Sequence, residues 1–464
     1  MASYDLILIG GGPGGYVGAI RAAQLGKKVA CIENDRAGGT CLNWGCIPTK
    51  ALLKNAELYH TLSHRAAEFG LNVEGLSYDW EKVIGRSRQV SDKLAGGIEF
   101  LFKKNKIDYI RGTGGLAANG KVEVIDAEGK SEIHTAANVL IATGCVSRGL
   151  PFLPFDGEKV IGSKDAMTLT KQPKSMVIIG AGAIGIEFAY FYSSYGTEVT
   201  VIEMMDRILP VEDSEVSAAL QKSLTKHGIK FHTSTKTAAA ETTEHGVRLT
   251  IEPAAGGDQQ TVEAEVCLVA VGVAPVLPKN AEQLKLTDRG YIETDARYQT
   301  NLPNVYAAGD IIGPPWLAHV ASYEATQAVE GMFDPKAKPK KVTLFPGCTY
   351  CHPEVASVGL TEDACKEKKL DYRVGKFPFA ASGRALAVAD AEGFVKIIFD
   401  KKHGEILGAH IIGAGATELI AEMGLAMNLE ATNEEIEATI HAHPTLAEAI
   451  HEAAGDAFGH AVHI

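Results

Sequence analysis

The glycine-rich stretch Gly10-Gly11-Gly12-Pro13-Gly14-Gly15 decides the fold of the first part of the chain. It follows a short apolar run, Tyr4–Ile9, and precedes residues 16–23, whose apolar positions recur with a helical period. A strand, a glycine turn and a helix in this order are typical of a unit that binds a dinucleotide at the helix N-terminus. We predict that Gly10 and Gly12 let the backbone approach a pyrophosphate. Gly15 would let the helix pack closely on the strand.

An acidic residue completes this first unit. The next apolar run, residues 28–32, ends in Glu33, which lies 23 residues after Gly10. The spacing of about twenty residues is the one expected for a carboxylate that accepts a hydrogen bond from an adenosine ribose. We therefore predict that Glu33 belongs to the dinucleotide site.

The same unit recurs later in the chain. The strand-like run Ser175–Ile179 is followed by a turn with glycines at Gly180, Gly182 and Gly185, and Glu203 again lies 23 residues after the first glycine. Equal spacing predicts either a second dinucleotide site or a duplicated unit in which one site has been lost. A carboxylate at position 203 accepts a hydrogen bond from a free 2′-hydroxyl and repels a 2′-phosphate, which favours NAD over NADP.

Two cysteines follow the first unit, at Cys41 and Cys46. A disulfide needs Cα atoms roughly 4.4–6.8 Å apart, whereas five residues of regular helix rise about 7.5 Å. The backbone must therefore bend between them, and Gly45 permits a bend. Pro48 suits a first helical turn, so we expect Cys46 to begin a helix whose N-terminus stabilises a thiolate, with Lys50 one turn further on. We predict a redox-active pair rather than two reduced core cysteines.

Composition limits the classes of function. The chain has 464 residues, enough for about three domains. Its 45 basic and 57 acidic residues give a net charge of −12, which argues against a general nucleic-acid or anionic-membrane surface. The 8 cysteines are scattered, unlike the framework of a secreted domain. We expect a cytoplasmic protein. We also expect no membrane segment, because the apolar stretch 176–195 contains Glu187 and glycines that fit a strand, turn and helix.

Other strand-like runs divide the rest of the chain. Residues 138–142 lead into Thr143 and Gly144, residues 266–271 into Gly272, and residues 304–309 into Asp310. Beyond a polar connector at 335–341, strands and then helices indicate a separate α+β domain. The expected fold class is α/β, with two Rossmann-like dinucleotide-binding domains and a C-terminal α+β dimerisation domain. The expected domains are 1–148, 149–274, 275–345, which would complete the first cofactor site, and 346–464.

Two motifs in the C-terminal part of the chain contain histidine or cysteine residues suited to chemistry. Cys348-Thr349-Tyr350-Cys351-His352 matches a haem-attachment pattern, but it resembles a buried strand entrance, and we expect no haem and no metal site there. His443 is a candidate base, and Glu448 is a candidate partner that would fix its tautomer. Only geometry can decide whether these two side chains touch.

Taken together, these motifs resemble the flavin-dependent pyridine nucleotide disulfide oxidoreductases over nearly the whole chain, and most closely the members that oxidise dihydrolipoamide. The resemblance rests on both glycine fingerprints, on Gly39–Lys50 and on the segments 142–144, 308–310, 317–319 and 443–448. It implies a homodimer in which His443 and Glu448 serve the dithiol of the other subunit. Cys41 would meet the substrate and Cys46 the flavin.

The resemblance also distributes the cofactors. FAD would occupy the first site, lined by Gly10, Gly12, Gly15, Glu33, Lys50, Gly114, Thr143, Gly144, Asp310 and Ala318. NAD would occupy the second, lined by Gly180, Gly182, Gly185, Glu187, Glu203 and Gly272.

The implied activity is oxidation of protein-bound dihydrolipoamide to lipoamide with reduction of NAD. The implied partners are the lipoyl domains and acyltransferase core of a 2-oxo acid dehydrogenase complex. Two alternatives stay open, a related NAD(P)H-dependent disulfide reductase and a mainly docking role. Three residues depart from the family pattern, namely Trp44, Ala183 and Val273, and their roles are open, as is that of the Cys348/Cys351 pair.

Overall fold

The computed structural model describes residues 3–118 and 121–464 of the chain. These residues form two compact units, which are described one at a time. Unit 1 consists of residues 1–51, 84–148 and 273–343, and unit 2 of residues 52–83, 149–272 and 344–464. Both units are thus assembled from segments far apart in the sequence.

Unit 1 is built on a mainly parallel sheet. Its strands follow the order β3-β2-β1-β6-β5-β4, and β17 pairs with β6. The parallel strands are β1 (Ser3–Ile9), β2 (Val29–Glu33), β3 (Asp108–Arg111), β6 (Ser131–Ile141) and β17 (Val305–Ala307). The antiparallel strands β4 (Thr113–Ala117) and β5 (Lys121–Ile125) continue from the N-terminal part of β6.

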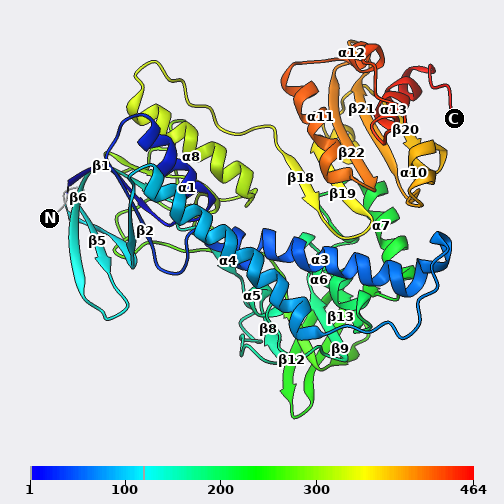
Figure 1. The fold of residues 1–464 in the computed structure, drawn as a ribbon, viewed down its shortest axis with the longest axis horizontal. Helices are drawn as coiled ribbons and strands as arrows, with labels where there is room; N and C mark the ends of the chain where they lie inside the picture. The colour runs from blue at the N-terminus through cyan, green and yellow to red at the C-terminus, as the bar shows by residue number, and fades with distance from the viewer. Residues whose placement is uncertain (1–2, 119–120) are drawn as a thin grey trace. The chain divides into compact units, whose positions relative to one another are not determined.

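The first strand is buried on both faces, which explains its unbroken apolar run. Leu6 and Leu8 pack with residues of α1 (Pro13–Gln24) and α8 (Ala318–Phe333), whereas Ile7 and Ile9 belong to the core on the opposite face. The helices α1 and α8 lie side by side (Figure 1). The start of α1 is therefore fixed at the carboxyl end of β1, where ligands bind in folds of this kind.

Unit 2 repeats the arrangement of the first dinucleotide unit. Its parallel sheet has the order β11-β10-β9-β15-β8. The strands are β8 (Val160–Ile161), β9 (Ser175–Ile179), β10 (Glu198–Ile202), β11 (Lys230–His232) and β15 (Val266–Val269). The helix α6 (Ala183–Ser194) follows β9 as α1 follows β1. An antiparallel ribbon of β12 (Thr235–Thr243), β13 (Gly246–Pro253) and β14 (Gln260–Ala264) completes this half.

Residues 52–83 group with unit 2 because of an aromatic cluster. They comprise most of α3 (Cys46–His60) and the start of α4 (Trp80–Lys104). The ring of Tyr59 stacks on Tyr195 at 5.0 Å between centroids, and Trp80 lies 5.6 Å from Phe191. The indole N–H of Trp80 also donates to the carbonyl of Leu169 at 2.8 Å. Periodicity along the sequence could not reveal this grouping, because it depends on contacts between rings that are remote in the sequence.

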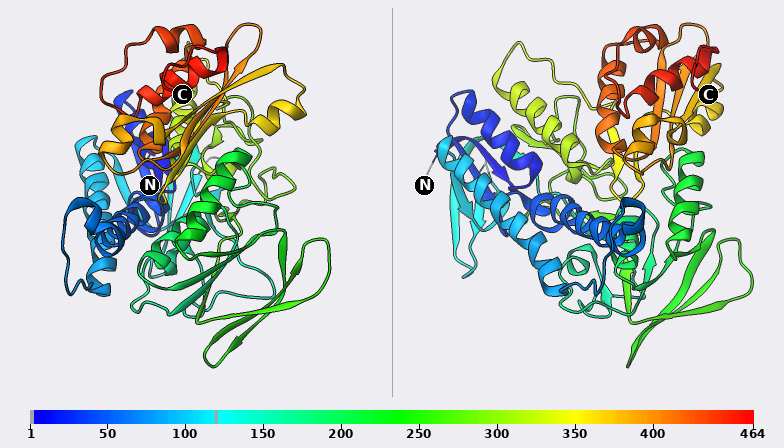
Figure 2. Two further views of the ribbon diagram at one scale, coloured as in Figure 1. Left: turned by 90° about the vertical axis from the view of Figure 1, so that its right-hand side faces the viewer. Right: turned by 45° about the vertical axis from the view of Figure 1, so that its right-hand side comes forward.

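The C-terminal part of unit 2 is an antiparallel sheet covered by helices. The strand order is β18-β19-β22-β21-β20, with β18 (Pro346–Thr349), β19 (Glu354–Gly359), β20 (Tyr372–Pro378), β21 (Phe394–Asp400) and β22 (Ile406–Gly413). The helices α11 (Ala416–Asn428) and α13 (Glu448–Phe458) pack against this sheet (Figure 2). The shorter helices are α9 (Glu362–Glu367), α10 (Gly383–Ala387) and α12 (Asn433–Ala438).

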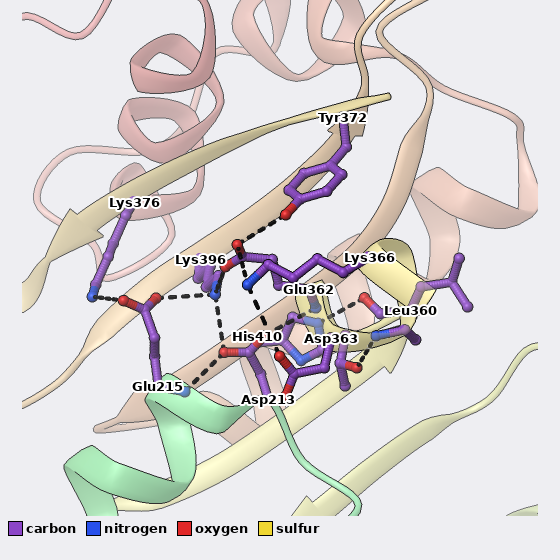
Figure 3. A network of polar contacts seen from close by, with 12 residues as sticks. Asp213, Glu215, Leu360, Glu362, Asp363, Lys366, Tyr372, Lys376, Lys396 and His410 are labelled. Atoms are coloured by element: carbon purple, nitrogen blue, oxygen red, sulfur yellow. Dashed lines mark hydrogen bonds and ion pairs between the residues drawn. The ribbon is translucent and has the colours of Figure 1, made fainter. Parts of the chain in front are cut away.

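A buried ion-pair network joins this sheet to the second dinucleotide half within unit 2 (Figure 3). The Nζ of Lys396, on β21, lies 3.0 Å from Asp213, the N-cap of α7 (Ser214–Lys226), and 2.7 Å from Glu362 of α9. The side chains of Lys396 and Asp213 have no exposed surface. Burial would lower the pKa of Lys396, but its hydrogen bonds to carboxylates raise it above the usual range. The amine therefore stays charged and holds α7 on β21.

The expected fold class is confirmed, since the chain combines two parallel dinucleotide-type sheets with a C-terminal α+β part. The four-domain division stays a prediction. Among the described residues, no helix combines the length and the apolar character that a membrane crossing requires.

Candidate functional site

The first glycine turn is shaped so that only glycine fits at two of its positions. Gly10 has φ +107°, and a Cβ there would lie 2.3 Å from the carbonyl oxygen of Ala142. A Cβ on Gly15 would lie 1.8 Å from the carbonyl oxygen of Gly10. By contrast, Gly12 is the N-cap of α1, and the nearest atom to a Cβ there would be 3.8 Å away. The turn is thus packed on the protein side and has room at the helix N-terminus, as a pyrophosphate site needs.

The acidic residues of the two units are held in matching ways. The Oε2 of Glu33 accepts a hydrogen bond from the N–H of Gly11 at 2.7 Å, and its Oε1 accepts from Asp35 at 2.8 Å. In unit 2, Oε2 of Glu203 accepts from Ala181 at 2.7 Å and Oε1 from Met205 at 2.8 Å. Each carboxylate is therefore fixed over its glycine turn, with lone pairs left to accept ribose hydroxyls.

The second glycine turn copies the first. Gly180 has φ +103°, and a Cβ on it would lie 2.4 Å from the carbonyl oxygen of Ala270. A Cβ on Gly185 would lie 2.1 Å from the carbonyl oxygen of Gly180, whereas Gly182, the N-cap of α6, has no atom within 4 Å of such a Cβ. Gly272 follows β15 with φ +102° and is equally open.

Glu187 differs from the other candidates of the second site because it points into protein. It lies on α6, is 4% exposed, and accepts a hydrogen bond from the backbone N–H of Tyr350 at 3.0 Å. Glu187 belongs to unit 2, whereas Lys50, which is predicted to line the FAD site, belongs to unit 1.

Several predicted FAD residues gather at the carboxyl ends of β6 and β17 in unit 1. Thr143 and Gly144 lie one residue beyond the end of β6, and the hydroxyl of Thr143 is buried with no hydrogen-bond partner among the described residues. Asp310 follows β17, and burial raises the pKa of its carboxyl to about 6. Ala318 is the first residue of α8. Gly114 lies in β4, where a Cβ would come within 2.7 Å of Ile9.

The two cysteines lie on separate helices joined by a bend. Cys41 belongs to α2 (Gly39–Trp44), and Cys46 is the first residue of α3. Gly45 between them adopts φ −153° and ψ −112°, which ends α2, and a Cβ on it would press on the carbonyl of Thr40 at 3.2 Å. Thr49 closes the first turn of α3, since its N–H and its hydroxyl both donate to the carbonyl of Gly45. The predicted bend and the predicted helix start at Cys46 are both confirmed.

The two thiols lie in different electrostatic environments. A hydrogen bond with Cys46, together with burial, raises the pKa of the Cys41 thiol well above its usual range, and the nearby Lys50 opposes this only in part. Ionisation of the Cys41 thiol is therefore disfavoured. The helix N-terminus favours negative charge at the other sulfur, that of Cys46.

The dithiol segment starts directly against the first glycine turn. The N–H of Gly38 donates to the carbonyl of Gly11 at 2.9 Å. A Cβ on Gly39, the first residue of α2, would lie 2.5 Å from the Cα of Gly12. The redox pair and the first dinucleotide site therefore form a single constellation in unit 1.

His443 and Glu448 touch, which the sequence left open. The Nδ1 of His443 lies 2.9 Å from Oε1 of Glu448, the first residue of α13. The other oxygen of Glu448 accepts from the N–H of Thr445 at 2.8 Å. The hydrogen bonds from Thr445 and His443 lower the pKa of this carboxyl. The His443 side chain is 80% exposed in unit 2, so its Nε2 can reach a group outside its own chain.

Sequence reasoning missed three residues that fix this constellation. Glu324 of α8 accepts a hydrogen bond from the N–H of Gly309 at 2.8 Å and so holds the turn that carries Asp310. Asp35 accepts a hydrogen bond from the indole nitrogen of Trp44 at 2.5 Å. The guanidinium of Arg88 lies over the same indole, 5.0 Å from the ring centroid. No periodic or motif signal marks Glu324 or Arg88, because their partners lie on segments remote in sequence.

These features fit FAD in the first site. The glycine turn has room beside the N-terminus of α1, Glu33 is held over that turn by the N–H of Gly11, and the orphaned Thr143 hydroxyl can be satisfied by a polar group of a ligand. A second open turn with an oriented Glu203 fits NAD.

Comparison with known proteins gives matches along most of the chain. Residues 4–325 match the model of the pyridine nucleotide-disulphide oxidoreductases, and residues 345–454 match the dimerisation domain of the same family. A dihydrolipoyl dehydrogenase of Rhizobium etli is 46% identical over 98% of this chain and 98% of its own length. A mitochondrial dihydrolipoyl dehydrogenase of Pisum sativum is 43% identical over 99% of this chain and 92% of its own length. The crystal structure of LpdA from Mycobacterium tuberculosis is similar with a TM-score of 0.89, 26% identity, and coverage of 98% and 99% of the two chains.

Proposed function

Since the chain belongs to the pyridine nucleotide-disulphide oxidoreductase family, we propose that it acts as a dihydrolipoyl dehydrogenase with FAD as cofactor and NAD as electron acceptor. One observation carries the proposal: Cys41 is hydrogen-bonded to Cys46, and its helix α2 starts against a dinucleotide-type glycine turn. Full-length similarity to dihydrolipoyl dehydrogenases supports the choice of substrate.

The first half-reaction is an exchange of thiols and disulfides. One thiolate of dihydrolipoamide attacks the sulfur of Cys41, and Cys46 leaves as a thiolate. The second substrate thiol then displaces Cys41, so that lipoamide is released and two electrons remain on the enzyme dithiol. The raised pKa of Cys41 and the helix N-terminus at Cys46 both support this division of roles.

His443 is the proposed base of this step. Its Nδ1 is held by Glu448, so Nε2 takes the substrate proton while the carboxylate stabilises the imidazolium. In the homodimer that we propose, each His443 serves the dithiol of the partner subunit. The dimerisation-domain match and the exposure of His443 support this arrangement.

The cofactors divide between the two glycine turns. FAD in the first site would be held by the turn at Gly10–Gly15, by Glu33 and by the residues around Asp310 and Ala318, with Lys50 and Gly114 as further members. FAD bound there would supply the two-electron redox chemistry that links the dithiol to NAD. NAD would be held by Gly180, Gly182, Gly185 and Gly272. Glu203 would accept from its ribose, and this carboxylate supports NAD over NADP.

The proposed partners are the lipoyl domains and the acyltransferase core of a 2-oxo acid dehydrogenase complex. The substrate proposed for this dithiol-oxidising site is a dihydrolipoyl group, which is carried by a protein-bound lipoyl arm. The acidic surplus of −12 supports a basic module as the docking surface on that core.

A single assay tests the proposal. The purified flavoprotein is mixed with dihydrolipoamide and either NAD or NADP, and formation of the reduced nucleotide is followed. We expect rapid NAD reduction, little NADP reduction, and no turnover in Cys46→Ser. Cys365→Ala removes a buried thiol of α9 far along the chain and serves as the matched control with retained activity. Absence of NAD reduction, together with fast NADPH oxidation by another disulfide, would overturn the assignment.

A further inference from the structure

Trp44 occupies the last position of α2, immediately before the bend that separates the two cysteines. It is half-buried, and its indole N–H donates to Oδ2 of Asp35 at 2.5 Å. The guanidinium of Arg88, from α4, lies over the indole ring at 5.0 Å from its centroid. The side chain is therefore held on one edge and on one face, by two segments outside the dithiol motif.

Each partner of Trp44 is itself fixed. The N–H of Asp35 donates to Glu33 at 2.8 Å, and the carbonyl of Asp35 accepts from Arg111 at 2.6 Å. Arg88 donates through Nη1 to the backbone carbonyl of Asn43 at 2.7 Å. Burial lowers the pKa of Arg88, and the nearby Asp92 partly compensates. The indole thus contacts an exposed carboxylate, carried on a hydrogen-bonded backbone, on one side and a half-buried cation on the other.

The contacts of Arg88 reach the backbone of α2 itself. Asn43, next to Trp44, is fully buried, and its amide nitrogen donates to the carbonyls of Ala37 at 3.1 Å and Gly39 at 2.9 Å. The backbone carbonyl of Asn43 accepts the hydrogen bond from Arg88. The C-terminal end of α2 is therefore tied to α4 and back to the loop at its own start.

The other side of the bend is tied to the same helix. Arg86, two residues before Arg88 on α4, donates to the carbonyl of Ala51 of α3 at 2.9 Å. α4 therefore holds α2 and α3 on either side of Gly45. Because Cys41 and Cys46 lie on these two helices, the distance between their sulfurs depends on both attachments.

We propose that Trp44 is a positioning residue for the Cys41–Cys46 pair: clamped between Asp35 and Arg88, it fixes the end of α2 and so favours the disulfide over the dithiol. Two thiols held within reach of each other have a high effective concentration, and this favours the intramolecular disulfide. A loosened α2 lowers that effective concentration, and the pair is then reduced more easily. The inference rests on the proposed function only in taking this pair as redox active.

The test is an equilibrium between the enzyme pair and dithiothreitol. Reduction breaks the Cys41–Cys46 bond, and two electrons and two protons pass from one dithiothreitol, which closes its own disulfide. The flavoprotein is equilibrated at several ratios of reduced to oxidised dithiothreitol, quenched with acid, and alkylated. Trypsin cleaves after Arg36 and Lys50, and the peptide 37–50 contains both cysteines and no other. Its mass therefore gives the fraction of dithiol directly.

Three variants and one control decide the result. Trp44→Phe keeps a ring under Arg88 but removes the N–H donor, Trp44→Leu removes both contacts, and Asp35→Ala removes the acceptor. Loss of one net hydrogen bond should shift the equilibrium about threefold or more toward the dithiol, with Trp44→Leu shifted furthest. Tyr372→Phe likewise deletes one donor from a ring, the O–H that bonds Glu362 in unit 2, and its equilibrium should match that of the wild type.

The outcomes separate the two proposals. If Trp44→Phe and Asp35→Ala are less stable but keep the wild-type equilibrium, Trp44 only packs and the inference is overturned. If the wild-type pair forms no disulfide at any ratio, the proposed function itself fails. A shift in all three variants with none in Tyr372→Phe supports the inference.

Discussion

At the residue scale, the pairing of His443 with Glu448 illustrates how one contact defines a chemical role. An imidazole with one nitrogen engaged by a carboxylate has a fixed tautomer and a single nitrogen left for proton transfer. The Nδ1 to Oε1 distance of 2.9 Å and the further bond from Thr445 to the same carboxylate provide that arrangement. His441, two residues earlier, differs because it is 7% exposed and paired with Glu422. Only His443 of these two is placed to exchange protons with an incoming group.

We predict that His443→Gln lowers kcat for dihydrolipoamide oxidation by about 10²–10⁴, since the base is lost. Glu448→Gln should lower it less, because the base stays and only its orientation and charge stabilisation weaken. Steady-state kinetics with NAD as acceptor measure both effects. His403→Gln, at an exposed turn after β21, is the matched control and should keep the wild-type kcat. An unchanged kcat in His443→Gln would exclude the proposed role.

A second residue-scale prediction concerns the pH dependence of stability. Glu212 is 6% exposed, and burial raises the pKa of its carboxyl to about 7. Between its unfolded pKa and about 7, the folded state binds more protons than the unfolded state, so the contribution of Glu212 to stability falls as pH rises through this window. Glu212→Gln, which cannot ionise, should therefore flatten the stability profile between about pH 5 and 8, by up to roughly 3 kcal/mol at the alkaline end.

Urea unfolding at a series of pH values measures this effect. Glu241→Gln, on the exposed ribbon β12, is the control and should leave the profile as it is in the wild type. Equal slopes for Glu212→Gln and the wild type would show that the Glu212 carboxyl is not the titrating group.

At the element scale, the bend between α2 and α3 and the network around Lys396 have the same physical basis. In each, two elements are held by polar side chains from a third segment, namely α4 for the two dithiol helices and β21 for α7 and α9. The sequence predicted the bend from Gly45 and the helix start from Pro48. It gave no sign of α4 as the support, because Arg88 lies 45 residues from Asn43. The position of Lys396 within an apolar strand likewise did not predict which carboxylates it would pair with.

We predict that Lys396→Met destabilises unit 2 by about 3–5 kcal/mol, because it leaves the buried carboxylate of Asp213 without its counter-charge. Lys376→Met removes a partly exposed amine that contacts the same cluster through Glu215, at 3.4 Å. This control should lose less than about 1 kcal/mol. The urea midpoints of the two variants give the comparison. A loss in Lys396→Met no larger than that in Lys376→Met would show that the network contributes little.

At the scale of the whole molecule, the proposed active site needs two chains. The dithiol belongs to unit 1 and the His443–Glu448 pair to unit 2, and the chain matches the dimerisation domain of its family. A homodimer can bring the exposed imidazole of one chain to the dithiol of the other. Its closed two-fold symmetry would then create two equal sites.

Mixed dimers test this arrangement. Cys46→Ser and His443→Gln are each expected to be inactive alone. After dissociation and random re-pairing, half of the dimers combine the two variants, and each of these has one intact site if His443 acts on the partner's dithiol. The mixture should then recover about a quarter of the wild-type activity. No recovery, despite exchange of subunits shown by a mass tag, would place base and dithiol on the same chain.

The sequence by itself determined the features whose signals are local. Both dinucleotide units, their acidic residues, the bend at Gly45 and the helix start at Cys46 follow from residue types at short spacing, because backbone conformation responds to near neighbours. The structure alone decided the contacts between remote segments. These are the clamp on Trp44, the hydrogen bond from Gly309 to Glu324, the touching of His443 and Glu448, and the partners of Lys396. Such contacts depend on how finished elements pack, and no spacing along the chain encodes that packing.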